Sequence, residues 1–182
     1  GGNATVGVDG IFAFYDNLSF SGYYARTTPG GTTGSEASYR GRFDYTGDRY
    51  GFEAEHLMVG EAFNPQVGYV RRTDFRRTYS QVRFSPRVRR IRQLRRLSWE
   101  ASLDYIENAP GTTVMNRDAV GNFNIEFNNG DTLNSEFAHT YEFVPGRFAI
   151  SPGVIVPAGG YEGHNFKSAY TMGQQHKLAG TL

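Results

Sequence analysis

The chain has 182 residues, a formal net charge of +1 and no cysteine, so it is long enough to bury a core as one domain. The near-zero charge argues against a nucleic-acid binder driven by bulk charge, and the lack of cysteine excludes a disulfide framework and a thiolate metal site. With 23 Gly, 12 Tyr, 14 Phe and a mean hydropathy of -0.51, the composition is typical of a β protein with an aromatic face.

No run reaches the ~18 consecutive apolar residues of a membrane-spanning helix. The first residues, GGNATVGVDG, are interpreted as part of a strand and not as a signal peptide, so the signal of an exported chain would have been removed or would lie upstream. Low hydropathy is still compatible with a membrane protein, because the strands of a β-barrel show lipid only every second residue.

The first half of the chain alternates apolar and polar residues in strand-like runs. In the third run, Phe43 and Tyr45 lie on an aromatic face. Arg40, Arg42 and Asp44 lie on the opposite, polar face. The strands predicted from this alternation are 3–14, 18–28, 36–46, 49–59 and 74–85.

The second half continues the same pattern. The turn Asn128-Asn129-Gly130-Asp131 is the strongest hairpin signal in the chain. We interpret the Pro/Gly-rich segment 145–160 as a loop, and the residues after the 173–175 turn as a tenth strand that runs to Leu182. The strands predicted before this last one are 97–107, 117–127, 132–144 and 161–172.

About ten strands of roughly 10–13 residues match the ~9–11 residues that a tilted strand needs to cross a bilayer. The connections also alternate in length, as the short periplasmic turns and longer extracellular loops of outer-membrane barrels do. We therefore predict an all-β fold, an antiparallel up-and-down transmembrane β-barrel. Residues 1–182 would form a single barrel region, incomplete at both ends and part of a larger barrel. The short connections are 15–17, 47–48, 128–131 and 173–175, with 86–96 in the same series, and the long ones are 29–35, 60–73, 108–116 and 145–160.

The cost of a charge decides which face meets lipid. An Arg or Lys on the lipid face near the bilayer midplane costs roughly 2–4 kcal/mol, so the aromatic faces are expected to meet lipid. The strand after Asp74 carries Arg76 on one face and Arg77 on the other, and we expect it to project beyond the membrane at its loop end. The charged residues expected to face the lumen, and to be available there for binding, are Arg40, Arg42, Glu100, Asp104, Glu126 and Glu136.

The loop 60–73 has two interpretations. It is either a binding or plug element inside the lumen, or a structural loop whose arginines pair with lumenal carboxylates. We favour the structural role, because an ordered loop also needs turn-setting residues. The binding residues under the first interpretation are Asn64, Arg71, Arg72 and Asp74.

The basic connection 86–96 also has two interpretations. Its arginines would contact lipid phosphates or a periplasmic partner, or they would form an ordinary solvated turn. We favour the solvated turn, because each charge near an anionic surface contributes only about 1 kcal/mol.

No catalytic constellation is apparent. A glycosidase needs two carboxyl groups ~5–9.5 Å apart, and we interpret the many acids of the polar faces as a polar lumenal wall instead. The histidines, at positions 56, 139, 164 and 176, lack metal-ligand spacing, and no GxSxG, P-loop or dinucleotide motif occurs. We predict no enzyme activity, no metal and no cofactor. The acids weighed for the glycosidase pair are Glu53, Glu55, Glu100, Asp104, Glu126, Glu136 and Glu142.

Three stretches carry a family resemblance: GEAFNPQVGYVRRTDFRR at 60–77, followed by SPR at 85–87; EFNNGDTL at 126–133; and ISPGVIVPAGGY at 150–161. Together they resemble a bacterial family of unknown function, whose members carry a large C-terminal β-barrel-like region behind an N-terminal carbohydrate-binding family 9-like module. The resemblance implies an outer-membrane location and a link to carbohydrate, and it transfers no catalytic residue. The module itself is absent from this sequence, and HKLAGTL at 176–182 lacks the terminal aromatic residue of a complete outer-membrane barrel.

We therefore expect a bacterial outer-membrane β-barrel that acts as a pore, a transporter or a surface anchor, linked to carbohydrate binding or uptake. Its expected partners are outer-membrane lipid, a glycan or small solute, and other envelope proteins, with no nucleic acid. The alternatives are a soluble all-β carbohydrate-binding module and a glycan-acting enzyme with lumenal carboxylates.

Overall fold

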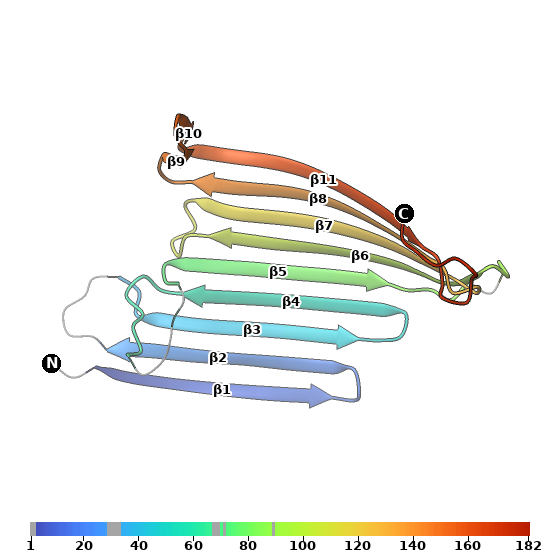
Figure 1. The fold of residues 1–182 in the computed structure, drawn as a ribbon. Coiled ribbons are helices and arrows are strands. Elements are labelled where there is room, and N and C mark those ends of the chain that lie inside the picture. The colour runs from blue at the N-terminus through green and yellow to red at the C-terminus, as the bar shows by residue number, and fades with distance from the viewer. Residues whose placement is uncertain (1–2, 29–33, 67–69, 71, 89) are drawn as a thin grey trace.

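The computed structural model describes residues 3–28, 34–66, 70, 72–88 and 90–182. Nine strands form one sheet in the order β1-β2-β3-β4-β5-β6-β7-β8-β11, and every neighbouring pair is antiparallel. A separate two-stranded hairpin, β9–β10, lies beyond the ends of β8 and β11 (Figure 1). The strands are β1 (Ala4–Phe14), β2 (Leu18–Thr28), β3 (Ala37–Thr46), β4 (Tyr50–Val59), β5 (Phe75–Phe84), β6 (Leu94–Glu107), β7 (Val114–Phe127), β8 (Thr132–Val144), β9 (Phe148–Ser151), β10 (Val154–Val156) and β11 (Gly159–Thr171).

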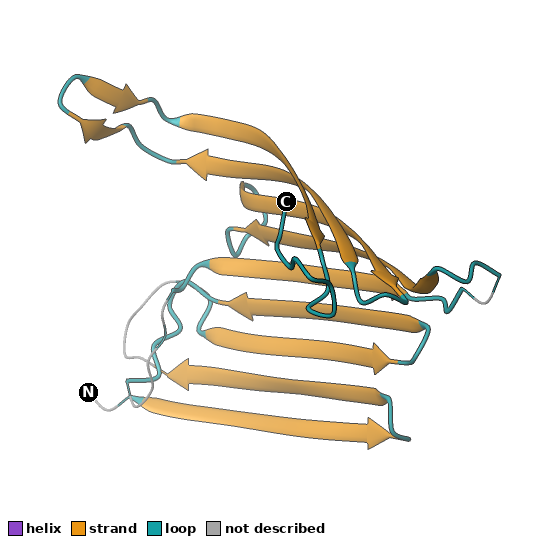
Figure 2. Cartoon of the chain, turned by 45° about the vertical axis from the view of Figure 1, so that its right-hand side comes forward, coloured by secondary structure: helices purple, strands orange, loops and turns teal. Residues whose placement is uncertain are grey.

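The sheet follows chain order from β1 at one edge to β11 at the other, and it twists from β6 onward (Figure 2). The all-β, antiparallel, up-and-down prediction is confirmed. The strands follow chain order because each hairpin connection returns the chain beside the strand it has just left, where the two strands pair along their length.

The two faces of the sheet differ in chemistry. Directly paired residues of antiparallel strands lie on the same face, so the register assigns each side chain to a face. One row on the first face runs Phe12, Phe20 and Phe43 across β1, β2 and β3. A row on the second face runs Asp44, Glu53 and Gln81 across β3, β4 and β5. We call these the aromatic face and the polar face.

Little of the described chain is buried. Val59 and Phe63 are the hydrophobic residues classed as buried among the described residues, and aromatic side chains such as Phe12 and Trp99 are exposed. The accessible surface is 12581 Å², against roughly 8,800 Å² for a compact monomer of the same mass. A single uncovered sheet accounts for this excess.

The strand boundaries require four corrections. β6 begins at Leu94 and β7 at Val114, so the connections predicted at 86–96 and 108–116 are shorter than expected. The predicted loop 145–160 contains the β9–β10 hairpin, which turns at Gly153 with a φ of 85°. The predicted tenth strand is wrong: after β11 the described structure has an isolated bridge between Thr171 and Thr181.

The connections do alternate between the two ends of the sheet, because consecutive strands are antiparallel. Their lengths follow the predicted series with one exception. The connection 85–93, at the end with the tight turns, is longer than both 29–36 and 108–113 at the opposite end. We call these ends the turn end and the loop end.

Candidate functional site

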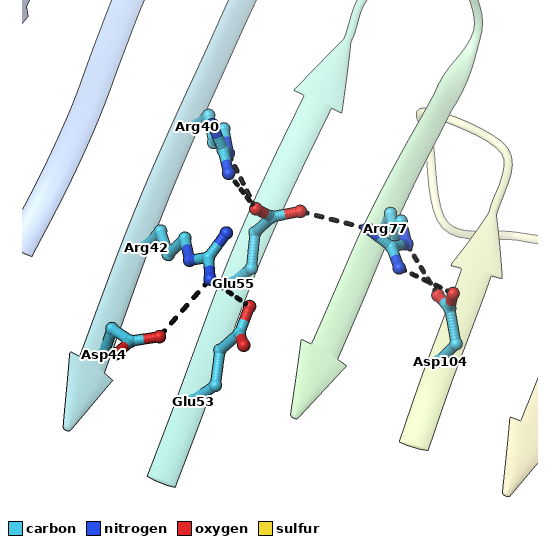
Figure 3. A network of polar contacts seen from close by, with 7 residues as sticks. All are labelled: Arg40, Arg42, Asp44, Glu53, Glu55, Arg77 and Asp104. Atoms are coloured by element: carbon cyan, nitrogen blue, oxygen red, sulfur yellow. Dashed lines mark hydrogen bonds and ion pairs between the residues drawn. The ribbon is translucent and has the colours of Figure 1, made fainter. Parts of the chain in front are cut away.

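An ion-pair network crosses four strands on the polar face (Figure 3). Glu55 on β4 lies at its centre. Arg40 Nε donates to Glu55 Oε2 at 2.7 Å, and Arg77 reaches Glu55 Oε1 at 3.1 Å. Arg77 also donates two hydrogen bonds to Asp104, at 2.8 and 2.7 Å. A side branch joins Arg42 to Glu53 at 3.0 Å and to Asp44 at 3.3 Å.

Burial makes Glu55 the most constrained member of this network. Its side chain is 8% exposed, whereas the side chains of Arg40 and Arg77 are 36% and 31% exposed. Two guanidinium groups therefore compensate one buried carboxylate, and breaking such a pair leaves an uncompensated charge. Because the contacts run between neighbouring strands, they also fix the register of β3 to β6, where a slip of one residue would reverse both faces.

Three of the predicted lumenal residues meet in this network: Arg40, Arg42 and Asp104. The other three lie on the same face but outside it. Glu126 is 4.0 Å from Arg95, and Glu136 is 3.4 Å from Lys167. Glu100 lies opposite Arg83 on β5.

The sequence pattern does not single out Arg77 as a binding residue, although Arg77 joins the two halves of the network. The signal was present in the alternation, which places Arg77 on the same face as Arg83. Identifying its partners requires the pairing of β4, β5 and β6, because Asp104 lies 27 positions away in the chain. Local periodicity carries no information on that pairing.

The predicted loop residues are structural where they are described. The Asn64 N–H donates to Thr27 Oγ1 at 3.2 Å, and the Asn64 carbonyl accepts from Asn3 Nδ2 at 2.7 Å. Asp74 has a φ of 57° at the start of β5, and its carboxylate accepts from the Ala109 N–H at 3.3 Å. These contacts tie the loop to the loop end of the sheet.

Of the two arginines predicted as binding residues of the loop, the structure describes Arg72. Arg72 donates to the Met115 sulfur and lies over the Phe75 ring at 5.5 Å. The expected pairing of this arginine with a lumenal carboxylate is therefore wrong in the described structure, which surrounds Arg72 with polarisable and aromatic groups. Arg71 lies outside the described residues.

The loop 60–66 folds over the polar face, and Phe63 is buried there at 8% exposure. A cavity of about 690 Å³ lies next to this loop, and its lining includes Val59, Phe63, Phe75 and Ile106. The loop end of the polar face thus has a recess of mixed polar and apolar lining beside the ion-pair network, to which Tyr23, Ser38 and Arg72 also contribute. A second cavity, of about 760 Å³, lies on the aromatic face.

Replacing Gly60 by alanine is expected to lift this loop from the sheet. An added Cβ would lie 2.1 Å from the Ser35 carbonyl oxygen, where the Ala62 N–H now donates at 3.0 Å. Overpacking of this kind costs about 1–3 kcal/mol. Limited proteolysis should then cut within 60–66 far faster than in the parent protein. Gly41→Ala is the control, since its Cβ would meet no atom within 4 Å, and equal cleavage of both variants would contradict the assignment.

The aromatic face carries a ladder of four rings near the turn end. Tyr50 and Phe84 have ring centroids 5.2 Å apart, Phe84 and Trp99 are 5.8 Å apart, and Trp99 and Phe123 are 5.2 Å apart. Beside the ladder, small residues at Ala101 and Gly121 leave a groove, which is the 760 Å³ cavity. Its surface is apolar, and the ring of Trp99 is part of its wall.

A second polar cluster lies at the turn end, around Asp131. Asp131 Oδ1 accepts from the Gly173 N–H at 2.7 Å and lies 2.8 Å from His176 Nε2. Its other oxygen accepts from Tyr170 Oη at 2.5 Å and from Asn129 Nδ2 at 2.7 Å. These hydrogen bonds, led by the one from Gly173, lower the pKa of Asp131 from 3.8 to about 2. The cluster explains why the final residues turn back toward β11.

Replacing Asp131 by asparagine should destabilise residues 172–182, because the ionised carboxylate is the better acceptor. A lowered pKa in the folded state means that the contribution is complete above about pH 4 and is lost as the pH falls toward about 2. Urea unfolding of parent and variant should therefore differ at neutral pH and converge in acid. Asp16→Asn, at an exposed turn residue, should show no such pH-dependent difference. A parent–variant difference that kept its neutral-pH size at pH 2 would contradict this role.

The described residues hold no group of three or more potential metal ligands. Within the same ranges, no helix has the length and apolar character required to cross a membrane. What the geometry defines is an all-β protein built on one large antiparallel sheet, with an ion-paired polar face and an uncovered aromatic face.

Comparisons of the chain with protein-family models, with curated proteins and with solved structures found no match. The family resemblance of the three sequence stretches therefore stays a prediction.

Proposed function

We propose that the chain is a membrane-spanning part of a bacterial outer-membrane β-barrel, with its aromatic face toward lipid and its polar face toward an aqueous lumen. The observation that carries the proposal is the uncovered aromatic face of a single sheet whose nine strands are 10–14 residues long. Such strands are long enough to cross a bilayer. A face of this kind exposed to water would be an association site.

The position of the charges supports the same orientation. The arginines that the strand register places on the aromatic face lie toward the loop end of their strands, and each has a carboxylate partner. The middle of this face, from Trp99 to Leu103 on β6, is free of charge. A pair at the rim avoids the roughly 2–4 kcal/mol cost of an Arg at the bilayer midplane. The pairs are Arg26–Glu36 at 3.6 Å, Arg76–Glu107 at 2.7 Å and Arg117–Glu162 at 3.2 Å.

Strand parity supports a larger barrel. In an up-and-down sheet of nine strands, β1 and β11 run in the same direction. Bacterial single-chain barrels have an even number of antiparallel strands. Antiparallel closure between β1 and β11 would thus need an odd number of further strands, and we propose that this chain supplies one segment of the wall.

The lumenal side would then act as a pore, a transporter or an anchor for a surface module. The ion-pair network around Glu55 and the loop over Val59 would narrow the lumen and offer hydrogen bonds to a polar solute. A link to glycan binding or uptake follows from the sequence resemblance and belongs to this proposal, as do the partners: outer-membrane lipid, a solute and other envelope proteins.

A soluble carbohydrate-binding sandwich has less support. It requires a second layer over the aromatic face, and the described residues form one layer with a small hairpin at its end. A glycan-acting enzyme would use lumenal acids that lie outside the ion-pair network around Glu55. Glu100→Gln and Glu136→Gln variants that left glycan hydrolysis intact would count against it.

The test refolds the complete barrel to which this chain would belong into lipid vesicles, because the edge strands β1 and β11 would otherwise be left unpaired in lipid. The protein should become protected from added protease in vesicles of phosphatidylcholine, and its mobility on a gel should change on heating. Recovery as a monomer that stays soluble without detergent would contradict the proposal.

A further inference from the structure

The recess at the loop end of the polar face has a floor and a roof. Its floor runs from Tyr23 on β2 to Ile106 on β6, and its roof includes Phe63 and Arg72. Neighbouring strands of a sheet lie about 4.8 Å apart, so the four spacings from β2 to β6 make the floor about 19 Å long. The volume of about 690 Å³ falls within the ~300–1,000 Å³ typical of small-molecule sites. These dimensions fit an elongated small molecule.

The middle of the recess is apolar. Val59 on β4 and Phe75 on β5 are directly paired, so their side chains lie next to each other on the floor. Val59 is 7% exposed, and Phe63 in the roof is 8% exposed. The loop therefore shields this part of the recess from the surrounding water. An apolar group that enters it also loses its contact with water, which favours binding.

Arg72 carries the only charge among the described residues that line the recess. Its guanidinium donates to the Met115 sulfur at 2.7 Å and lies 5.5 Å from the centre of the Phe75 ring. Both partners are neutral, so they position the guanidinium without compensating its charge. Asp74, the carboxylate nearest to Arg72 in the chain, accepts instead from the Ala109 N–H at 3.3 Å. The charge of Arg72 is thus available to an anion.

The β2 end of the recess is polar but uncharged. Tyr23 Oη and Ser38 Oγ are joined by a hydrogen bond of 3.0 Å. Tyr23 is directly paired with Arg40, but Arg40 is already held by Glu55 at 2.7 Å. A cationic ligand would therefore meet no carboxylate among the described lining residues, whereas an anionic ligand would meet Arg72.

We propose that this recess binds an organic carboxylate with an elongated apolar body. The carboxylate pairs with Arg72, and the body lies against Val59, Phe63 and Phe75. Arginine suits a carboxylate because its planar guanidinium donates two parallel hydrogen bonds. It has five N–H donors, of which Met115 takes one. The inference names a solute class for the lumenal side and rests on the proposed function for the access of that solute from the lumen.

The test uses 4-phenylbutanoate as the probe. Its neutral analogue, 4-phenylbutan-1-ol, keeps the apolar body, and acetate keeps the charge without the body. Each compound is titrated by isothermal calorimetry into the complete barrel that contains this chain, in detergent micelles, and the heat from empty micelles is subtracted. Arg72→Gln removes the proposed partner of the carboxylate. The matched control is Arg147→Gln, which removes an exposed charge between β8 and β9 at the loop end.

The parent and Arg147→Gln should bind 4-phenylbutanoate about tenfold more tightly than the alcohol, because a hydrogen bond to a charged group contributes at least that factor. In Arg72→Gln the two affinities should lie within about twofold of each other. Equal binding of acid and alcohol by the parent, which needs no variant, would overturn the inference. A preference for the acid that survives in Arg72→Gln would overturn it too. Acetate bound as tightly as 4-phenylbutanoate would indicate a small-anion site instead.

A second pair of variants tests the roof of the recess. Gly60→Ala, which should lift the loop, should weaken the binding of acid and alcohol alike, because both lose their contact with Phe63. Gly41→Ala, whose added Cβ would meet no atom within 4 Å, should bind both compounds as the parent does. Unchanged affinities in Gly60→Ala, in a protein whose loop is cut faster by protease, would place the ligand outside the recess and overturn the inference.

The proposed function fails separately. If the complete barrel does not become protease-protected in lipid vesicles, the membrane proposal is wrong, and the same titrations in buffer without detergent still decide whether the recess binds the carboxylate. Protection in vesicles without a preference for the acid overturns only the recess.

Discussion

An arginine at position 101 should lower the free energy of unfolding in a lipid bilayer by about 2–4 kcal/mol. Ala101 lies on the aromatic face of β6 between Trp99 and Leu103, and its side chain is exposed. In water, replacing an exposed alanine by arginine would leave the free energy of unfolding nearly unchanged. In lipid the guanidinium group must leave water, so the cost of Ala101→Arg reports whether lipid or water surrounds this face. Urea unfolding in vesicles, followed by tryptophan fluorescence, gives the value.

Ser102→Arg is the matched control. Ser102 is the next residue on the same strand and lies opposite Gln81 on the polar face. It should change the free energy of unfolding by less than about 1 kcal/mol, because a lumenal side chain keeps its water. Equal costs at both positions would contradict the proposal that one face meets lipid. A larger cost at Ser102 would show that the polar face meets lipid instead.

Replacing Glu55 by glutamine should have the second large effect: it should lower the free energy of unfolding by about 1–3 kcal/mol. The substitution keeps the shape of the side chain but leaves Arg40 without its carboxylate at 2.7 Å and Arg77 with Asp104 alone. Removing one partner of a fully buried pair costs about 3–5 kcal/mol, and the partial exposure of both arginines reduces that figure.

Glu53→Gln tests whether the effect belongs to the centre of the network. Glu53 lies two residues earlier on the same face and has one arginine partner, Arg42, at 3.0 Å. Its 22% exposed side chain should make its loss cost no more than about 1 kcal/mol. If Glu53→Gln and Glu55→Gln lowered the free energy of unfolding equally, the burial of Glu55 would not be the cause of its effect.

The two faces of the sheet could be predicted from sequence because side-chain direction along a strand has a period of two residues. Phe43 and Arg42 are neighbours in the chain and lie on opposite faces, as the alternation indicates. The Asn128–Asp131 turn was predictable for a similar reason, since Gly130, with a φ of 80°, meets a local backbone requirement.

The remaining features depend on residues far apart in the chain. A strand is predicted from the sequence at 176–182, but Asp131 holds Gly173 and His176 and redirects the chain. Arg77 finds Glu55 and Asp104 only after three strands pair. The short strands β9 and β10, at 148–151 and 154–156, are too brief for periodicity to separate them from a loop.

Fluorescence quenching of Trp99 by brominated lipids tests the central claim most directly. Trp99 is the one tryptophan of the sequence and belongs to the aromatic ladder, where it is 42% exposed. If the aromatic face meets lipid, phospholipids brominated on their acyl chains should quench most of the Trp99 emission, while aqueous iodide should have little effect. Strong quenching by iodide with none by the brominated lipids would contradict a lipid-facing sheet.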